Sequence, residues 1–274
     1  MSPKPRPVLI AGNWKMNHGK EDTVTYFAEL KQRWERDLDI ATRSLFTEGR
    51  LALCLFPPML SLRSALYECG DLPVQIGSQN AHWEKSGAFT GEVSGAMLQE
   101  AGIETVLVGH SERRQLFGET DETVRKRAES LLAQGLKVIL CIGETRAERE
   151  SNQTSVVLTR QLKGALPEKG KGAAAYLDGR LVIAYEPVWA IGTGLTATPE
   201  QAEEAHQMIR KHLWDEFGME AAGRTQILYG GSVTPENSAG LLAKPNLDGA
   251  LVGGASLKPA NFLAIALAGA KACS

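Results

Sequence analysis

The stretch "AYEPVWAIGTG", residues 184–194, places a single carboxylate directly after an apolar run and before a proline, a valine and a tryptophan. A glutamate in water is a weak base, with a pKa of about 4.3. Apolar neighbours remove water from the charged form and raise its affinity for a proton. We therefore predict that Glu186 is a general base. The alternative is an acid that pairs with Lys15 or an arginine for structural reasons alone.

An amide, an ammonium group and an imidazole follow two other apolar runs. Asn13 and Lys15 lie in "AGNWKMN" (11–17), and His110 lies in "VGHSERR" (108–114). The polar residues after His110 are typical of a helix start, where the helix dipole opposes protonation and favours a neutral, hydrogen-bond-donating ring. Lys15 could offset the charge of a phosphate or an oxyanion. A packed histidine and a solvated lysine are the alternatives.

Two glycine turns complete the set. Gly230, Gly231 and Ser232 follow one apolar run, and Gly253 and Gly254 follow the next. Backbone N–H groups without side chains around them can approach an anion closely. Tight-turn geometry alone could explain one such turn, but two at matching positions favour a phosphate site. A base, a neutral donor, a cation and a phosphate cradle indicate proton transfer next to a carbonyl. We expect no cofactor and no metal.

The elements that carry these residues are eight short apolar runs, continuous rather than alternating, as in strands covered on both faces. Helix-like segments separate them, which predicts an α/β fold with a single closed (β/α)8 barrel whose chemistry lies at the carboxyl ends of the strands. An open doubly wound sheet is less favoured, because no G-x-G-x-x-G pattern follows the first run. The predicted strands are residues 8–12, 51–56, 74–78, 105–109, 137–143, 181–186, 226–230 and 249–254.

Helix boundaries are marked in several places. Apolar residues at helical spacing predict a helix over 24–38, with Val24, Phe27, Leu30 and Trp34 on its inner face, and another over 122–136 that ends near Gly135. The sequences 198–201 and 234–236 are typical helix starts. Residues 163–176 are interpreted as a surface insertion at the non-catalytic end of the barrel.

Composition limits the other possibilities. The chain has 274 residues, 43% of them hydrophobic, and a formal net charge of −2, which argues against nucleic-acid binding. The cysteines, Cys54, Cys69, Cys141 and Cys273, lie far apart, as expected for buried reduced thiols. The apolar segments near both ends are too short for a secretory signal or a membrane span. We expect a soluble, cytoplasmic protein that does not bind membranes.

The motifs "AGNWKMN", "VGHSERR", "CIGE", "AYEPVWAIGTG", "YGGSV" and "DGALVGGASL" resemble the triosephosphate isomerase family, in order and over nearly the whole chain. The resemblance implies one TIM barrel domain over residues 1–274, with 1–7 as an N-terminal tail. It also implies interconversion of D-glyceraldehyde 3-phosphate and dihydroxyacetone phosphate through an enediolate, a step of glycolysis and gluconeogenesis. The roles it implies are a base for Glu186, a neutral electrophile for His110, oxyanion stabilisation for Asn13 and Lys15, support beside Lys15 for Glu112, and phosphate binding for Gly192, Ser232, Gly253 and Gly254.

The resemblance further implies a mobile lid over residues 187–197. Its first hinge is Pro187, Val188 and Trp189, its second is residues 195–197, and Ala190, Ile191, Gly192, Thr193 and Gly194 lie between them. The hydroxyl of Tyr229 would latch onto the backbone of Ala197. Most family members carry lysine where this chain has Leu195, which bears on lid opening rather than on chemistry. Residues 38–50 and 163–180 are longer than in compact members.

The resemblance also implies that the chain forms a homodimer. The loop "QNAHWEKSGAFTGEVS" (79–94) would insert into a neighbouring subunit through Phe89, Thr90, Gly91 and Glu92, and Phe89 exposed on a monomer would favour association. Two other functions stay open: an aldose–ketose isomerase for a larger phosphosugar, and a catalytically silent phosphate-binding scaffold. The bulky Trp189 favours a small substrate, and a binder would need no base.

Overall fold

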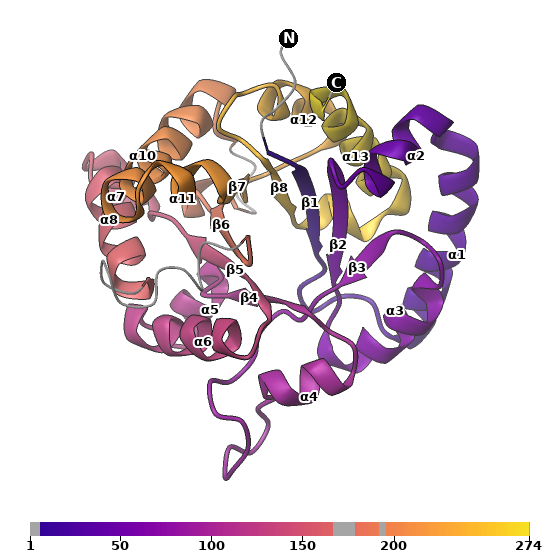
Figure 1. Ribbon diagram of the computed structural model, residues 1–274, viewed down its shortest axis with the longest axis horizontal. Coiled ribbons are helices and arrows are strands. Elements are labelled where there is room, and N and C mark those ends of the chain that lie inside the picture. Colours follow the sequence, from indigo (N-terminus) through magenta and orange to yellow (C-terminus); the bar gives the residue numbers. More distant parts are fainter. Residues whose placement is uncertain (1–5, 167–178, 192–195, 274) are drawn as a thin grey trace.

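The computed structural model describes residues 6–166, 179–191 and 196–273. Parallel strands form a barrel at the centre, and the helices surround it (Figure 1). The predicted (β/α)8 barrel is therefore confirmed. The strands are β1 (Val8–Asn13), β2 (Leu51–Phe56), β3 (Val74–Ile76), β4 (Thr105–Val108), β5 (Lys137–Ile142), β6 (Leu181–Tyr185), β7 (Gln226–Tyr229) and β8 (Gly249–Val252).

The barrel closes between β3 and β4, the strands at the two ends of the hydrogen-bonded order. The strand order runs β3-β2-β1-β8-β7-β6-β5-β4, and a single bridge from Ser78 to Val106 joins the ends. The Ser78 N–H donates to the carbonyl of Thr105 at 2.9 Å. Between β3 and this bridge lies Gly77, where a Cβ would collide with the ring of Phe56. The predicted strand 74–78 is thus interrupted after Ile76, and Ser78 restores its pairing.

Each strand packs on both faces. In β1, Leu9 and Ala11 point into the barrel, while Val8 and Ile10 pack against the helices outside. The inner cluster draws mainly on Leu, Ile, Val and Ala, so the barrel is filled rather than hollow. This two-sided burial explains why the apolar runs in the sequence do not alternate with polar residues.

The helices differ from the sequence expectations mainly in where they begin and in which residues they bury. The first begins at Lys20 rather than at residue 24, and its buried face includes Thr23 and Tyr26, while Val24 is 38% exposed. Residues 38–50 contain a further helix, capped by Asp39, whose carboxylate accepts from the Thr42 N–H at 2.8 Å. The helices are α1 (Lys20–Asp37), α2 (Ile40–Thr47), α3 (Leu62–Cys69), α4 (Gly95–Glu100), α5 (Ser111–Leu116), α6 (Asp121–Ala133), α7 (Arg146–Glu150), α8 (Thr154–Ala165), α10 (Pro199–Phe217), α11 (Met219–Arg224), α12 (Pro235–Leu242) and α13 (Pro259–Cys273), with short 3₁₀ turns η1 (Met59–Ser61), η2 (Val188–Ala190) and η3 (Gly254–Leu257).

Predicted helix ends agree with the structure. Thr198 caps α10 by accepting from the Gln201 N–H, and the Thr198 N–H donates to Gln201 Oε1 at 2.9 Å. Gly135 follows α6 with a φ of 87°, a backbone region that favours glycine. Of the expected insertion 163–176, the part up to residue 166 is described and contains the end of α8; residues 167–178 lie outside the described part.

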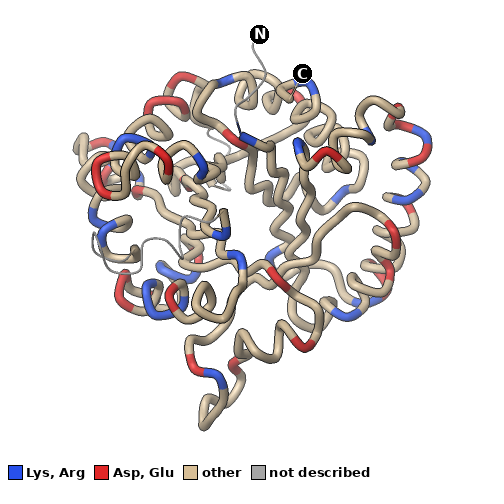
Figure 2. The backbone as a smooth tube through the Cα atoms, in the orientation of Figure 1, with Lys and Arg blue, Asp and Glu red and all other residues tan. Residues whose placement is uncertain are grey.

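Charged residues of both signs are interspersed along the surrounding helices (Figure 2), in keeping with the net charge of −2. All four cysteines are buried and unbridged, as expected. Among the described residues, every helix is too short or too polar to cross a bilayer.

Candidate active site

The polar residues that follow β1, β4 and β6 meet in one cavity of about 280 Å³. Because the carboxyl ends of parallel strands share one rim, residues far apart in the chain converge there. The predicted site residues that line this cavity are Asn13, Lys15, His110, Glu186, Ile191, Ser232, Gly253 and Gly254.

The imidazole of His110 and the carboxylate of Glu186 are in direct contact. His110 Nε2 lies 2.9 Å from Glu186 Oε1, and both side chains are buried. The N–H of Ser111 donates to Glu186 Oε2 at 2.9 Å. His110 is the N-cap of α5, and its Nδ1 accepts from the N–H of Glu112 at 3.2 Å. Since Nδ1 accepts, the ring carries its proton on Nε2, from where it donates to Glu186.

The two groups change one another's acidity. Burial lowers the pKa of His110, but the charge of Glu186 and the hydrogen bond to it outweigh burial and raise that pKa. Burial likewise raises the pKa of Glu186, but His110, the Ser111 N–H and Lys15 together bring it below its ordinary value. The carboxylate is therefore charged in this arrangement, and it loses much of that stabilisation when it moves away from His110.

Lys15 adopts a left-handed conformation with a φ of 53°, which is strained for a residue with a side chain. Its N–H donates to Asn13 Oδ1 at 2.9 Å, and its Nζ lies 2.6 Å from Glu112 Oε1. Gln79, at the start of the long loop, donates to the carbonyl of Lys15 at 2.7 Å and so holds the strained turn. Gln79 was not predicted, because a glutamine at a loop start has no pattern to distinguish it.

Two glycines allow the close approach of Glu186 to the neighbouring backbone. A methyl group at Gly230 would lie 2.8 Å from Glu186 Cγ, and one at Gly143 would collide with the Glu186 carbonyl. Gly253 lies near Lys15, with 3.7 Å from its added Cβ to Lys15 Cε. The glycine turns therefore bring backbone to the same cavity as the ammonium group.

We predict that Gly230→Ala lowers kcat/KM by about 100-fold, the loss expected when a reacting group is misplaced by about 1 Å. The matched control is Gly223→Ala, whose added methyl meets no atom within 4 Å. Steady-state kinetics beside thermal denaturation checks this. Equal kcat/KM in both variants would show that the glycine does not position Glu186.

Of the predicted lid, the structure describes residues 187–191 and 196–197; Gly192, Thr193 and Gly194 lie outside the described residues, as does Leu195. Val188, Trp189 and Ala190 form η2. Their anchor is Glu144, fully buried, whose Oε1 accepts from Tyr185 Oη and from Trp189 Nε1, each at 3.0 Å. Glu144 ends the motif "CIGE", but its role was not predicted, although a charged residue directly after a buried strand was a usable signal.

Tyr229 and Ala197 are neighbours, as expected for a latch. Burial raises the pKa of Tyr229 to about 12, against a lowering influence from the Ala197 backbone. Within the described residues, however, the Tyr229 hydroxyl makes no hydrogen bond of acceptable geometry. The latch residues are therefore close but not joined.

The fold and this rim define a (β/α)8 barrel that holds a buried carboxylate–imidazole pair and a lysine at the carboxyl ends of its strands. The profile of the family described as triosephosphate isomerase matches residues 8–269. The chain is 44% identical to the triosephosphate isomerase of Solibacter usitatus over 95% of this chain and 98% of that protein. For the Chlorobium chlorochromatii protein of the same name, identity is 47% over 97% and 99%. The chain belongs to the triosephosphate isomerase family.

Proposed function

We propose that this chain is a triosephosphate isomerase, which interconverts D-glyceraldehyde 3-phosphate and dihydroxyacetone phosphate through an enediolate. The observation that carries the proposal is the buried Glu186–His110 pair, 2.9 Å apart in one cavity with Lys15. Its relatives are named for this activity. A coupled assay with glyceraldehyde 3-phosphate tests it: rapid turnover is expected, whereas phosphate binding without turnover would indicate a scaffold.

In the proposed reaction, Glu186 removes a proton from the carbon next to the carbonyl and returns it to the neighbouring carbon. His110 Nε2–H donates to the carbonyl oxygen and passes protons between the two oxygens. Lys15 and Asn13 stabilise the negative oxygen. Backbone N–H groups of Ser232, Gly253, Gly254 and Gly192 hold the phosphate, and Glu112 keeps Lys15 in place through their 2.6 Å contact.

Glu186 must move before it reacts, because both its oxygens are engaged by His110 and Ser111. Substrate entering beside His110 would take over the Nε2–H donor and release the carboxylate. Closure of the lid, residues 187–197, then excludes water and strengthens the base while protecting the enediolate. In the closed state the Tyr229 hydroxyl latches onto the Ala197 backbone.

We expect Trp189→Phe to change kcat and KM together. The substitution removes the indole N–H that bonds to Glu144 at 3.0 Å, and a hydrogen bond to a charged group contributes about 1.5–3 kcal/mol. Because this bond fixes the first hinge, its loss shifts the balance between open and closed lid. Trp214→Phe, at an indole 55% exposed on α10, is the control. Unchanged kcat and KM for Trp189→Phe would show that the hydrogen bond to Glu144 does not fix the first hinge.

We also propose a homodimer. The loop 79–94 projects away from the barrel (Figure 1), and Phe89 in this loop is 41% exposed in the single chain. Met16, directly after Lys15, is 95% exposed, as is Leu60. Apolar side chains this exposed beside a site are typical of an interface. The loop residues Phe89, Thr90, Gly91 and Glu92 would insert into the second subunit, with Thr90 approaching its Asn13 and Lys15.

Sedimentation velocity checks the dimer. We predict that Phe89→Asp dissociates it and lowers activity, since a charge replaces an aromatic ring that the proposed interface would bury. Lys85→Asp, in the same exposed loop, should leave both unchanged. A parent protein that is fully active as a monomer at working concentration would overturn this part of the proposal.

Three further proposals concern the domain, the metabolic pathway and the cellular compartment. The whole chain, 1–274, forms one domain with residues 1–7 as its tail, and should unfold in a single calorimetric transition. The reaction belongs to glycolysis and gluconeogenesis, in the cytoplasm; growth of a host lacking its own enzyme and cell fractionation test these statements. Two separate transitions, or activity confined to a membrane fraction, would contradict them.

A further inference from the structure

Each of the two glycine turns at the active-site cavity contains a backbone carbonyl that is held by a polar side chain. The carbonyl of Ser232 accepts from Asn237 Nδ2 at 3.0 Å, and the carbonyl of Gly253 accepts from Ser256 Oγ at 2.7 Å. Ser232 and Gly253 line the cavity, whereas Asn237 and Ser256 are not among the described residues that do. The two carbonyls are therefore turned toward groups outside the cavity.

Asn237 bridges the first turn. Its Nδ2 donates to the Ser232 carbonyl while its Oδ1 accepts from the N–H of Thr234 at 2.9 Å, so one carboxamide ties both sides of the turn to α12. Pro235 begins that helix and restricts Thr234 to extended backbone, with a φ of −129° and a ψ of 164°. Since α12 packs against α13, the turn is tied to a fixed support.

Ser256 holds the second turn in a similar way. It is fully buried in η3, and the Gly253 carbonyl accepts from its N–H at 2.9 Å as well as from its hydroxyl. Gly12 of β1 makes room for it, because a Cβ at Gly12 would lie 2.8 Å from Ser256 Cβ. The second turn is thus wedged against the strand that leads to Lys15.

The direction of these carbonyls matters for an anion, because a carbonyl oxygen and a phosphate oxygen both carry negative charge. A trans peptide unit is planar, so a carbonyl that points out of the cavity sends the N–H of the following residue the opposite way. Those following residues are Val233 and Gly254, and both line the cavity. Holding the carbonyls outward therefore fixes N–H donors before an anion arrives, which lowers the ordering cost of binding.

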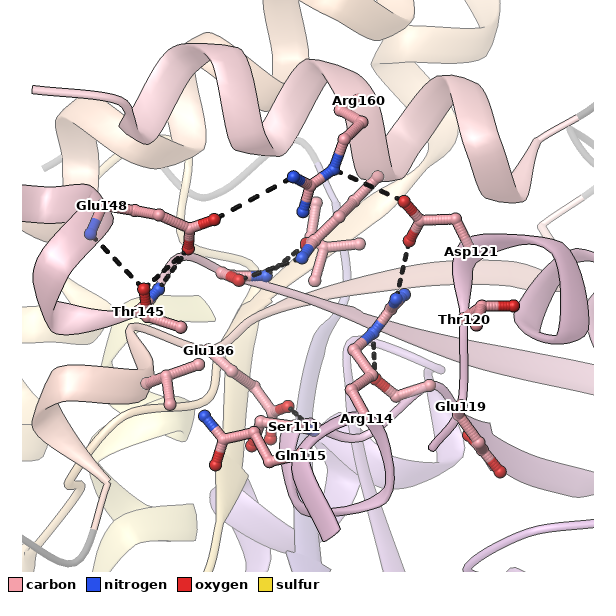
Figure 3. Close-up of a pocket in the computed structure, with 15 residues that line it drawn as sticks. Ser111, Arg114, Gln115, Glu119, Thr120, Asp121, Thr145, Glu148, Arg160 and Glu186 are labelled. Atoms are coloured by element: carbon pink, nitrogen blue, oxygen red, sulfur yellow. Dashed lines mark hydrogen bonds and ion pairs between the residues drawn. The ribbon is translucent and has the colours of Figure 1, made fainter. Parts of the chain in front are cut away.

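A second cavity, of about 340 Å³, also has Glu186 in its lining (Figure 3). Its two arginines, Arg114 and Arg160, are both directed at Asp121, with 2.7 and 3.5 Å between nitrogen and oxygen. Their charge is therefore already offset by a carboxylate. Of the two cavities that Glu186 lines, the one with the glycine turns suits a phosphate.

We propose that Asn237 and Ser256 are positioning residues that set the affinity for phosphate by holding the carbonyls of the two glycine turns out of the cavity. The inference rests on the proposed binding of phosphate by these turns. Neither side chain would contact the reacting carbons, so its effect is confined to the phosphate. Proton transfer by Glu186 on a substrate without phosphate should not depend on either one.

Two substitutions remove the bond from Asn237 to Ser232 in different ways. Asn237→Asp keeps an oxygen for the Thr234 N–H but adds a charge. Asn237→Ala adds no charge but loses both bonds. An effect that the two variants share therefore comes from the Ser232 carbonyl. Ala239→Asp, at an exposed position of α12, is the control for added charge.

Calorimetric titration with inorganic phosphate measures the affinity without requiring turnover. The Kd should rise at least about fivefold in both Asn237 variants, the effect of roughly one lost hydrogen bond. Ser256→Ala leaves the backbone N–H on the Gly253 carbonyl, so a smaller rise of about twofold is expected. Ser155→Ala, exposed on α8, and Ala239→Asp should match the parent.

Conversion of D-glyceraldehyde, which lacks the phosphate, is followed by NMR in the same proteins and should keep the parental rate. A raised Kd in both Asn237 variants together with this parental rate supports the inference. If conversion of D-glyceraldehyde slows in proportion to the rise in Kd, the inference is overturned, because the effect is then not confined to phosphate.

A parental Kd in both Asn237 variants and in Ser256→Ala, with no change beyond a lower midpoint of thermal unfolding, would also overturn the inference, since the side chains would then support the fold alone. A parent protein that does not convert glyceraldehyde 3-phosphate would instead contradict the proposed function. The Kd for phosphate would still decide the role of Asn237 and Ser256.

Discussion

Glu186→Gln should lower kcat by at least about 10²–10⁴-fold, the contribution typical of a positioned general base. The amide has nearly the same shape, can still accept from the Ser111 N–H, and cannot take up a proton at neutral pH. Because Glu186 is 2% exposed, water cannot readily replace it in the active-site cavity. Steady-state kinetics in both directions measures the loss.

Glu204→Gln, the same change at an exposed position of α10, is the matched control and should keep parental kinetics. Glu186→Asp retains the carboxylate but shortens its reach by one methylene, so kcat should also fall markedly. Parental kcat in the aspartate variant would argue against direct proton abstraction by this side chain.

His110→Ala should lower kcat by about 10²–10³-fold, as when one donor to a developing oxyanion is removed. The variant loses the Nε2–H that lies 2.9 Å from Glu186 and that is proposed to polarise the carbonyl. His212→Ala, at a half-buried position of α10, is the control. A loss confined to KM would mean that His110 binds substrate without stabilising the transition state.

The same variant should move the acid side of the pH profile. Burial raises the pKa of Glu186, and His110 is the leading group that lowers it. Removing His110 therefore raises that pKa. Since the base must be ionised, kcat/KM falls as pH drops through this pKa, and the fall should begin at higher pH than in the parent. An acid limb of kcat/KM that stays at the same pH, or moves to lower pH, would contradict the coupling between Glu186 and His110.

The barrel could be predicted from sequence because each strand is buried on both faces, which leaves a run such as "LALCLF" without polar residues. Which residues of a helix face the core was harder to predict. In α1 the expected inner residue Val24 is 38% exposed and Tyr26 is buried, because the face that carries Phe27, Leu30 and Trp34 continues through Thr23 and Tyr26 rather than through Val24.

The candidate site was predictable where a residue follows a strand and differs sharply from its surroundings, as do His110 and Glu186. Supporting residues were not. Gln79 acts through backbone contacts made across the rim, and Glu144 accepts a hydrogen bond from the Trp189 indole from a neighbouring strand end.

The most direct test of the central claim is deuterium uptake at carbon 1 of dihydroxyacetone phosphate in D₂O, followed by NMR for the parent and Glu186→Gln side by side. This measures removal of one proton and delivery of a solvent deuteron in its place, without requiring complete conversion. We predict rapid uptake by the parent and almost none by the variant. Equal uptake rates would contradict the assignment of Glu186 as the base.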